Sequence, residues 1–352
     1  MSVQKITPLR RVRAPSSVAA RPDLPFDLPV RLRRNRTSGN MRALLRENAL
    51  TPQDLILPVF VEEHASERQP VEAMPGVYRE TENSLADLVK SAQKENIPAV
   101  MLFGVSHHKD ECGTDSMRPG GLLDRMIRRA KDAAPDMLVI ADICFCEYTD
   151  HGHCGVMHAH KHTVDNDRTL QNIGQQAFIA AEAGADILAP SGMMDGMVAM
   201  IRHTLDTAGH EDIPIMSYAA KFASAFYGPF RAAAGCGLSE GEDRKTYQMD
   251  PANAHEALRE VEQDVLEGAD MLIVKPGLAY LDIVAKVKEA FAMPTFSYHV
   301  SGEYAMLRAA EEKGWIDYDT VLMETLLSFK RAGADGILSY GSIDAARTLN
   351  NL

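Results

Sequence analysis

Residues 267–276 read EGADMLIVKP, and this stretch decides the fold. A helix-compatible segment stops at Gly268, a turn over Ala269 and Asp270 follows, and four apolar residues then lead into Lys275. Glycine is the expected residue just past a helix end, because it adopts the left-handed conformation without a Cβ penalty. A short apolar run is typical of a parallel strand that is buried on both faces. The stretch therefore predicts a helix, a turn and a buried strand that ends at a lysine.

The same plan occurs twice more in the chain, as EAGADILAPS at 182–191 and RAGADGILSY at 331–340. Extending the template gives eight expected strands, at 54–61, 98–105, 137–144, 185–191, 214–221, 269–276, 294–301 and 336–342. Helical patterns separate most of them, among them 84–96, 121–133, 169–184 and 254–268. The chain therefore alternates strand and helix from end to end, apart from its first residues.

Eight such alternations predict an α/β fold, the closed (β/α)8 or TIM barrel, which reaches this length as a single domain. The alternative is an open, doubly wound sheet. That fold carries a glycine-rich phosphate loop after its first strand, and the corresponding stretch here, FVEEHASERQP at 60–70, contains no glycine. The barrel is therefore the prediction.

Charge separates an N-terminal arm from the rest of the chain. The 352 residues carry a net charge of −12, which is not typical of a nucleic-acid-binding protein, and no apolar stretch is long enough to cross a membrane. Residues 1–40, however, hold nine basic and two acidic side chains. We expect this extended N-terminal arm to dock on an acidic neighbouring subunit; a solvated tail and a targeting segment are the alternatives. Residues 41–352 are expected to form the barrel domain.

Three cysteines follow the third expected strand, in DICFCEYTDHGHCG at 142–155. Thiolates favour zinc, and three protein ligands leave a fourth position open for water or substrate. Cys144, Cys146 and Cys154 therefore predict a zinc site, with His151 and His153 as the nearest candidates for a fourth ligand. Three incidental buried thiols are the alternative. The chain has five cysteines, and an odd number without a secretory signal indicates a reducing, cytoplasmic location.

Two lysines end neighbouring expected strands. In a barrel of this kind reactive residues lie at the C-terminal ends of the strands, and adjacent strands lie about 4.8 Å apart, so Lys221 and Lys275 are expected to be close. Burial and a second cation both favour the neutral amine, the nucleophile that forms a Schiff base with a ketone. The alternative, for either lysine alone, is an ion pair with a carboxylate. Other polar residues at strand ends are Asp142, Ser191, Ser301 and Tyr340.

The long segment 226–250 follows Lys221 and carries Arg231 and Arg244 near its ends. A long loop over a barrel mouth is usually a functional lid. The planar guanidinium suits bidentate capture of a carboxylate, so the two arginines are candidate substrate-binding residues; ordinary surface arginines are the alternative.

Paired strand-end lysines, a three-cysteine loop and an arginine lid together resemble the porphobilinogen synthase (5-aminolevulinate dehydratase) family. The resemblance runs from about residue 30 to the C-terminus and is carried by GADMLIVKPGLAY at 268–280, SYAAKFASAFYGPFR at 217–231 and YQMDPAN at 247–253. The family condenses two molecules of 5-aminolevulinate into porphobilinogen in tetrapyrrole biosynthesis, with loss of two waters.

The resemblance implies the roles of individual residues. Lys275 matches the lysine that binds the first substrate, whose carboxylate is held at Ser301 and Tyr340. Lys221 matches the second lysine, whose substrate carboxylate meets Arg231, Arg244 and Gln248. Asp142 and Ser191 match polar residues that line the site.

The resemblance also implies metals and partners. Cys144, Cys146 and Cys154 match the ligands of a catalytic Zn²⁺, and Glu260 matches a glutamate that binds an activating, allosteric Mg²⁺ at a subunit interface. The arm matches an extension that wraps a partner subunit in homo-octamers. Thr246 stands where some members have a cysteine of a second zinc site, and Cys236 matches no family ligand.

Two other functions compete with this one. A class I aldolase would explain one lysine but leaves the second lysine and the three cysteines without a role. A zinc-dependent binding module would explain the cysteines but forms no covalent adduct at Lys275.

Overall fold

The computed structural model describes residues 28–239 and 241–351. The chain divides into two units, one ending at Glu47 and the other beginning at Asn48. The described part of the first unit holds a 3-10 helix, η1 (Leu32–Arg36), and a helix, α1 (Gly39–Leu44), and neither contains a buried residue. Two of the large apolar side chains of this unit, Leu32 and Leu44, are more than 70% exposed.

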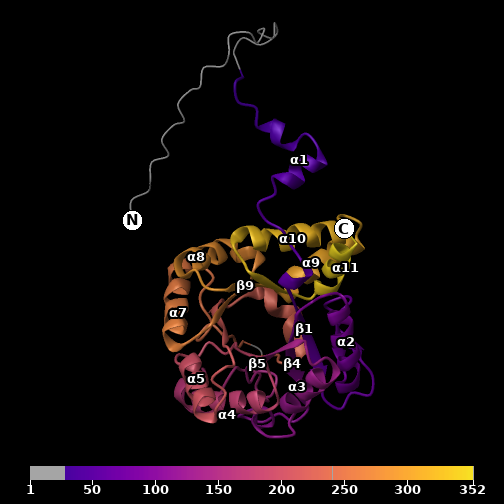
Figure 1. Cartoon of the computed structure of the whole chain (residues 1–352). Coiled ribbons are helices and arrows are strands. Elements are labelled where there is room, and N and C mark those ends of the chain that lie inside the picture. The colour runs from indigo at the N-terminus through magenta and orange to yellow at the C-terminus, as the bar shows by residue number, and fades with distance from the viewer. Residues whose placement is uncertain (1–27, 240, 352) are drawn as a thin grey trace. The chain divides into compact units, whose positions relative to one another are not determined.

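The second unit is a barrel of parallel strands surrounded by helices (Figure 1). Hydrogen-bonded neighbours follow the order β6–β5–β4–β1–β10–β9–β8–β7, and a parallel bridge from Leu188 to Ile215 joins the two ends of this path. The predicted (β/α)8 barrel is thus confirmed. Its strands are β1 (Leu55–Glu62), β4 (Ala99–Val105), β5 (Leu138–Ile143), β6 (Ile187–Pro190), β7 (Met216–Lys221), β8 (Met271–Lys275), β9 (Thr295–His299) and β10 (Gly336–Ser339).

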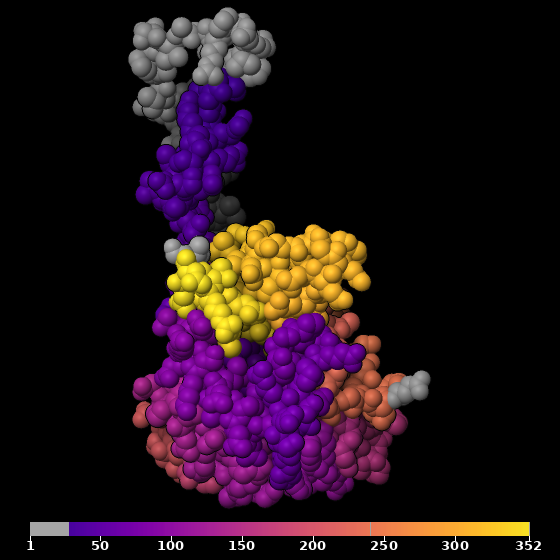
Figure 2. Space-filling view, turned by 90° about the vertical axis from the view of Figure 1, so that its right-hand side faces the viewer, coloured from indigo at the N-terminus to yellow at the C-terminus, as the bar shows by residue number. Residues whose placement is uncertain are grey.

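Helices alternate with these strands and form the outer ring in Figure 1. The ring contains α2 (Glu82–Lys94), α3 (Leu122–Ala133), α4 (Asn166–Glu182), α5 (Met197–Ala208), α7 (Ala254–Glu267), α8 (Leu281–Phe291), α10 (Tyr318–Ala332) and α11 (Ser342–Asn350). Figure 2 shows the yellow C-terminal segment directly against purple segments from the start of the barrel, as expected from the pairing of β10 with β1. In the part of the chain that the structure describes, no helix has the length and apolarity that a membrane span needs.

The second unit also contains short strands and helices that are not part of the eight-fold barrel pattern. A small hairpin of β2 (Gln69–Pro70) and β3 (Tyr78–Glu80) follows β1, and β3 pairs with β1. Helix α6 (Gly228–Ala234) lies in the lid segment, and α9 (Ser301–Glu312) follows β9. Short 3-10 helices occur at η2 (Pro52–Asp54), η3 (Thr114–Met117), η4 (Ala225–Tyr227) and η5 (Leu278–Tyr280).

The repeated Gly-Ala-Asp motif has a structural role in each of its three copies. The glycine ends the preceding helix in the left-handed conformation, with φ of 106° at Gly268 and 107° at Gly333. The aspartate then accepts a hydrogen bond from a backbone N–H near the start of the adjacent strand: Asp186 from Val139 (2.7 Å), Asp270 from Ile215 (2.8 Å) and Asp335 from Thr295 (2.7 Å). The motif therefore stops a helix and pairs a strand end that would otherwise lack a partner.

The strands are apolar on both faces, and every residue of β4 is buried. Each buried Val, Leu or Ile stabilises the barrel by about 1.5–3 kcal/mol relative to an exposed side chain. Because all eight strands run in parallel, their C-terminal ends lie on one rim, and the polar residues at these ends meet there.

Candidate active site

The two strand-end lysines lie side by side. Lys221 and Lys275 are register partners on the adjacent strands β7 and β8, and each is only 5% exposed. Both ammonium groups contact the ring of Tyr218, at 5.4 Å from Lys221 Nζ and 5.0 Å from Lys275 Nζ. Both also line one small, enclosed cavity. The structure therefore brings together the pair that the sequence predicted to be close.

The environment of Lys275 favours the neutral amine. Tyrosine and phenylalanine rings surround its Nζ, the nearest being Tyr298 at 4.3 Å from ring centre to nitrogen. Burial, followed by the charge of Lys221, lowers the pKa of Lys275 from 10.5 to about 7. Lys221 instead donates a hydrogen bond to the backbone oxygen of Ser191. Neither lysine forms an ion pair with a carboxylate within the described residues, so the structural alternative considered above is not observed.

Polar atoms without partners lie in the lid segment. Arg231 Nε, Arg244 Nε and both side-chain heteroatoms of Gln248 are buried and have no hydrogen-bond partner among the residues that the structure describes. Arg244 is held in place by the backbone oxygens of Gly152 (2.7 Å) and Cys236 (3.3 Å). Unpaired buried donors are costly, so such atoms suit a ligand that supplies acceptors, for example a carboxylate.

Ser301 and Tyr340 lie near Lys275 through intermediate groups. The hydroxyl of Ser301 accepts from the backbone N–H of Phe230, and Phe230 packs 5.1 Å from Lys275 Nζ. The hydroxyl of Tyr340 is 3.2 Å from that of Tyr298, the ring closest to Lys275. Each predicted carboxylate-binding hydroxyl therefore contacts a residue whose ring lies beside Lys275.

Two carboxylates share the cavity with the lysines. Asp142 accepts one hydrogen bond, from Ser191 Oγ at 3.1 Å, and its Oδ1 has no partner within the described residues. Burial, followed by the charge of Glu147, raises the pKa of Asp142 to about 7. Sequence reasoning did not single out Glu147, which is 2% exposed and lines the same cavity. The position of Glu147, directly after the predicted metal ligand Cys146, was the sequence feature that could have indicated it.

The three predicted metal ligands form one buried cluster. The sulfur atoms of Cys144, Cys146 and Cys154 all lie within 4.8 Å of one another, and the Cys144–Cys146 separation is 3.5 Å. Tetrahedral zinc–thiolate bonds of about 2.3 Å place the sulfurs about 3.8 Å apart, so the donor set fits zinc. Hydrogen bonds from Cys144 and Cys146 hold the pKa of Cys154 well below its usual range, whereas the pKa values of Cys144 and Cys146 lie well above theirs. Without a metal ion, the three thiols therefore favour one thiolate that accepts hydrogen bonds from two protonated neighbours.

The candidates for a fourth ligand lie elsewhere. His153 is buried, but its Nδ1 lies 3.0 Å from the hydroxyl of Tyr247. Neither His153 nor His151 belongs to the cluster of the three cysteine sulfurs. The thiol of Cys236, from the lid, is in hydrogen-bonding contact with Cys146. Sequence reasoning placed Cys236 in the lid but gave it no partner, because 90 residues separate it from Cys146.

Glu260 lies apart from the lysines. It lines a cavity of about 290 Å³ together with Glu256, Asp195 and Gln248. Burial, followed by the negative charges of Asp195 and Glu256, raises the pKa of Glu260. The carboxylates of the partly buried Glu256 and Glu260 and of the exposed Asp195 are the oxygen donors that magnesium prefers.

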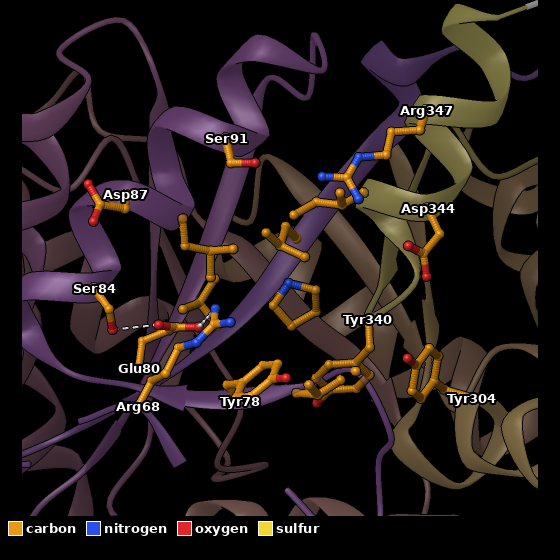
Figure 3. Close-up of a pocket in the computed structure, with 17 residues that line it drawn as sticks. Arg68, Tyr78, Glu80, Ser84, Asp87, Ser91, Tyr304, Tyr340, Asp344 and Arg347 are labelled. Atoms are coloured by element: carbon orange, nitrogen blue, oxygen red, sulfur yellow. Dashed lines mark hydrogen bonds and ion pairs between the residues drawn. The ribbon is translucent and has the colours of Figure 1, made fainter. Parts of the chain in front are cut away.

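A larger cavity, of about 540 Å³, lies outside the strand ring between α2 and α11 (Figure 3). Its wall contains Tyr340, and Figure 3 shows Arg68 and Glu80 on one side and Asp344 and Arg347 on the other. It contains neither of the two lysines nor any of the three cysteines. The small cavity with the lysines is therefore the candidate active site, because reactive groups converge there.

Comparisons with known proteins agree with this geometry. The family model described as delta-aminolevulinic acid dehydratase matches residues 29–348. The chain belongs to the delta-aminolevulinic acid dehydratase family. It is 53% identical over 320 residues to the delta-aminolevulinic acid dehydratase of Escherichia coli (strain K12), and 52% identical over 320 residues to that of Staphylococcus aureus (strain N315). Each match covers 91% of this chain and 98% of the relative.

A solved member of the delta-aminolevulinic acid dehydratase family has the same fold. The crystal structure of the delta-aminolevulinic acid dehydratase (porphobilinogen synthase) of Toxoplasma gondii ME49, in complex with the reaction product porphobilinogen, superimposes with a TM-score of 0.89. Sequence identity is 45%, over 91% of this chain and 92% of that chain. The predicted family membership is thus confirmed by sequence and by fold.

Proposed function

We propose that this enzyme condenses two molecules of 5-aminolevulinate into porphobilinogen and two waters, as a step of tetrapyrrole biosynthesis. The observation that carries the proposal is the register pairing of Lys221 and Lys275 within one buried cavity. The product-bound relative described above supports the same reaction. A single-lysine aldolase mechanism would leave the second buried amine without a role.

Lys275 is proposed to bind the first substrate. Its neutral amine attacks the ketone carbon, the resulting carbinolamine loses water, and a protonated Schiff base forms. The iminium withdraws electrons from the adjacent carbon and activates it. Ser301 and Tyr340 are proposed to hold the carboxylate of this substrate, since both hydroxyls lie near the aromatic groups that surround Lys275.

Lys221 is proposed to bind the second substrate in the same way. Its carboxylate would be held by Arg231, Arg244 and Gln248, whose buried nitrogens Nε, Nε and Nε2 are donors without a partner among the described residues. Fixing both substrates by an amine and a carboxylate site converts a two-molecule encounter into an effectively intramolecular reaction. We further propose that Asp142, oriented by Ser191, moves protons between the reacting carbons and nitrogens.

Cys144, Cys146 and Cys154 are proposed to hold a catalytic zinc ion. When bound, zinc supplies a Lewis acid that polarises a substrate oxygen or holds a substrate amine. The cluster shares the loop of Glu147, which lines the lysine cavity, so the metal would lie beside the reacting groups.

Glu260 is proposed to bind an activating, allosteric magnesium ion. Because its neighbours Asp195 and Glu256 are also acidic, a divalent cation would relieve their mutual repulsion. We expect Glu260→Ala to remove magnesium stimulation while activity without magnesium is retained. Steady-state rates across a magnesium titration measure this. A variant that is stimulated as strongly as the parent would contradict the assignment.

The chain is proposed to act as a cytoplasmic homo-octamer. Its N-terminal arm, residues 1–40, would wrap a partner subunit of a dimer, and the exposed apolar side chains Val30 and Leu32 suit such a contact. Most of the arm, residues 1–27, lies outside the described residues. The barrel domain is proposed to span residues 41–352, with 226–250 as the active-site lid.

Incubation with 5-aminolevulinate under reducing, zinc-replete conditions tests the proposed reaction. Porphobilinogen should form in a ratio of one product to two substrates consumed. Consumption without porphobilinogen, or no consumption, would defeat the proposal.

A further inference from the structure

A second group of metal-ligand side chains lies on the opposite side of the barrel mouth, after β1 and β4. Glu63 and His64 directly follow β1, and His108 follows β4 by three residues. One ligand atom from each of these three residues lies within 4.8 Å of the other two. From this geometry we propose that Glu63, His64 and His108 form a binding site for a transition-metal dication of the zinc, nickel or cobalt type. We call these three residues the rim triad.

The ligand atoms of the rim triad lie at separations close to those in a metal site, and the contact between His108 and Glu63 is a hydrogen bond that a metal ion would replace. His108 Nδ1 lies 2.9 Å from Glu63 Oε2, and His64 Nε2 lies 3.6 Å from Glu63 Oε1. Metal–nitrogen and metal–oxygen bonds of about 2.0–2.2 Å place neighbouring ligand atoms about 3.0–3.4 Å apart. Ligand shifts of a few tenths of an ångström would therefore admit the ion, with solvent completing its coordination.

The carboxylate of Glu63 is oriented by other groups. Arg125 Nη2 donates to Oε1 at 3.0 Å, while the backbone N–H of His107 and the hydroxyl of Ser106 donate to Oε2 at 2.9 and 3.2 Å. Arg125 is itself neutralised by Glu82, at 3.0 Å. Such outer contacts orient a metal-binding carboxylate, and they fix the position of the fully buried Glu63.

The two imidazoles are open to solvent, which gives an ion a path of entry. Their side chains are 63% exposed at His64 and 58% at His108, and the ring centres are 5.7 Å apart. His64 has a left-handed backbone, with φ of 57°, an uncommon conformation for a residue with a Cβ atom. Imidazole and carboxylate together suit zinc, nickel and cobalt rather than magnesium or calcium, which prefer oxygen ligands alone.

A metal at the rim triad would be linked to the lid. The loop that carries His108 continues into Lys109, whose Nζ donates to the backbone oxygen of Gly235 in the lid, at 2.6 Å. The rim triad is nevertheless separate from the lysine cavity and shares no residue with it. The proposal of metal binding at the rim triad and the proposal of the condensation reaction can therefore be tested, and refuted, independently of each other.

The test uses the full-length protein with its cysteine site loaded with zinc. Nickel ions are titrated by isothermal calorimetry while released zinc is measured in parallel. We expect one additional equivalent of nickel per chain without zinc release. His64→Gly and His108→Ala should each weaken nickel binding at least about tenfold. Glycine is chosen at position 64 because it adopts the left-handed backbone freely and offers no ligand.

Two matched control variants each remove an imidazole that lies outside the rim triad. His107→Ala removes an imidazole from the same loop that pairs with Glu62 instead, and His160→Ala removes one from a separate histidine-containing loop. Both should keep nickel affinity within about twofold of the parent. Absence of the extra equivalent, matching zinc release, or a loss of affinity confined to His160→Ala would overturn the proposal. An equal loss in His107→Ala and His108→Ala would overturn the assignment of ligands. Thermal unfolding without nickel checks that each variant is folded.

Discussion

Two buried carboxylates on the same barrel mouth have opposite electrostatic environments. Burial alone would raise the pKa of Glu63, after β1, but hydrogen bonds from Arg125, from a backbone N–H and from His108 lower it to about 2. Asp142, on β5, accepts one hydrogen bond from Ser191, and burial raises its pKa to about 7. Burial beside an arginine and several other donors holds a carboxylate in its charged form, whereas burial beside one hydroxyl donor and a second carboxylate leaves it able to exchange a proton.

The same contrast separates the two sides of the mouth. On the side of β5 to β8, Lys275 is buried among aromatic rings, and the lid arginine Arg244 has a buried donor that lacks a partner in the described residues. On the side of β1 and β4, Arg125 has two carboxylate partners. Unpaired buried groups cost stability, and they persist where a ligand or a reaction needs them. The comparison therefore assigns the proposed condensation to the first side, whereas on the second side Glu63 is held in its charged form by partners.

The largest expected effect concerns Lys275. Lys275→Met should lower porphobilinogen formation by about 10⁴-fold or more, because the covalent route is lost. Stability at pH 7 should be equal to or higher than that of the parent, since the buried ammonium is removed. Activity assays and thermal unfolding measure both effects. Lys286→Met, which changes an exposed lysine on α8, is the matched control and should retain activity. A Lys275→Met variant with more than a tenth of the parent activity would contradict the assignment of chemistry to the side of β5 to β8.

Metal removal should have the next largest effect. Chelation of the zinc ion that we propose for Cys144, Cys146 and Cys154 should lower activity about 100-fold or more, and added zinc should restore it. Cys112→Ala serves as control, because this half-exposed thiol lies outside the cluster. Unchanged activity in protein that is free of metal by elemental analysis would refute the assignment.

Exchanging each carboxylate for its amide separates the two sides of the mouth directly. Asp142→Asn should lower turnover about 100-fold with little loss of stability, because a proton-transfer group is removed and a buried charge is relieved. Glu63→Gln should instead cost about 2–3 kcal/mol of unfolding free energy, because Arg125 loses one of its two charged partners. Denaturant unfolding and steady-state kinetics compare the variants. If Asp142→Asn proved the less stable of the two and Glu63→Gln the less active, the comparison would be reversed.

The pH dependence of adduct formation is the smallest effect. Lys275 has a folded-state pKa of about 7, below its ordinary value of 10.5, so it loses its proton as pH rises through about 7. The rate of Schiff-base formation should therefore fall about tenfold per pH unit below this value. Because the unfolded chain keeps the proton up to about pH 10.5, this group's stability cost is greatest below pH 7 and disappears as pH rises toward 10.5. Stopped-flow measurement of adduct formation across pH 5–9 checks the profile. A rate that is constant down to pH 5 contradicts it.

The sequence predicted the barrel because the signals for its strands and helix ends are local. Each copy of the Gly-Ala-Asp motif marks a helix end and a buried strand, as Gly268 and Gly333 illustrate. The strand ends followed directly, so the sequence alone placed Lys221 and Lys275 on one rim. Family resemblance then supplied roles for lid residues such as Arg244.

What sequence reasoning missed depends on contacts between distant segments. The proximity of Cys236 to Cys146 arises only when the lid folds over the mouth. The rim triad was missed because the first two expected strands end in Val61 and Val105, whereas its three residues follow two or three positions later. The small hairpin of β2 and β3 was also unpredicted, because strands this short carry no periodicity.

The most direct test of the central claim is reductive trapping of the substrate on the lysines. The protein is incubated with 5-aminolevulinate and borohydride, digested, and its modified peptides are identified by mass spectrometry. The account predicts a reduced adduct on Lys275, and on Lys221 when both substrates are bound, with none on the exposed Lys286. An unmodified Lys275, or modification spread equally over surface lysines, would contradict it.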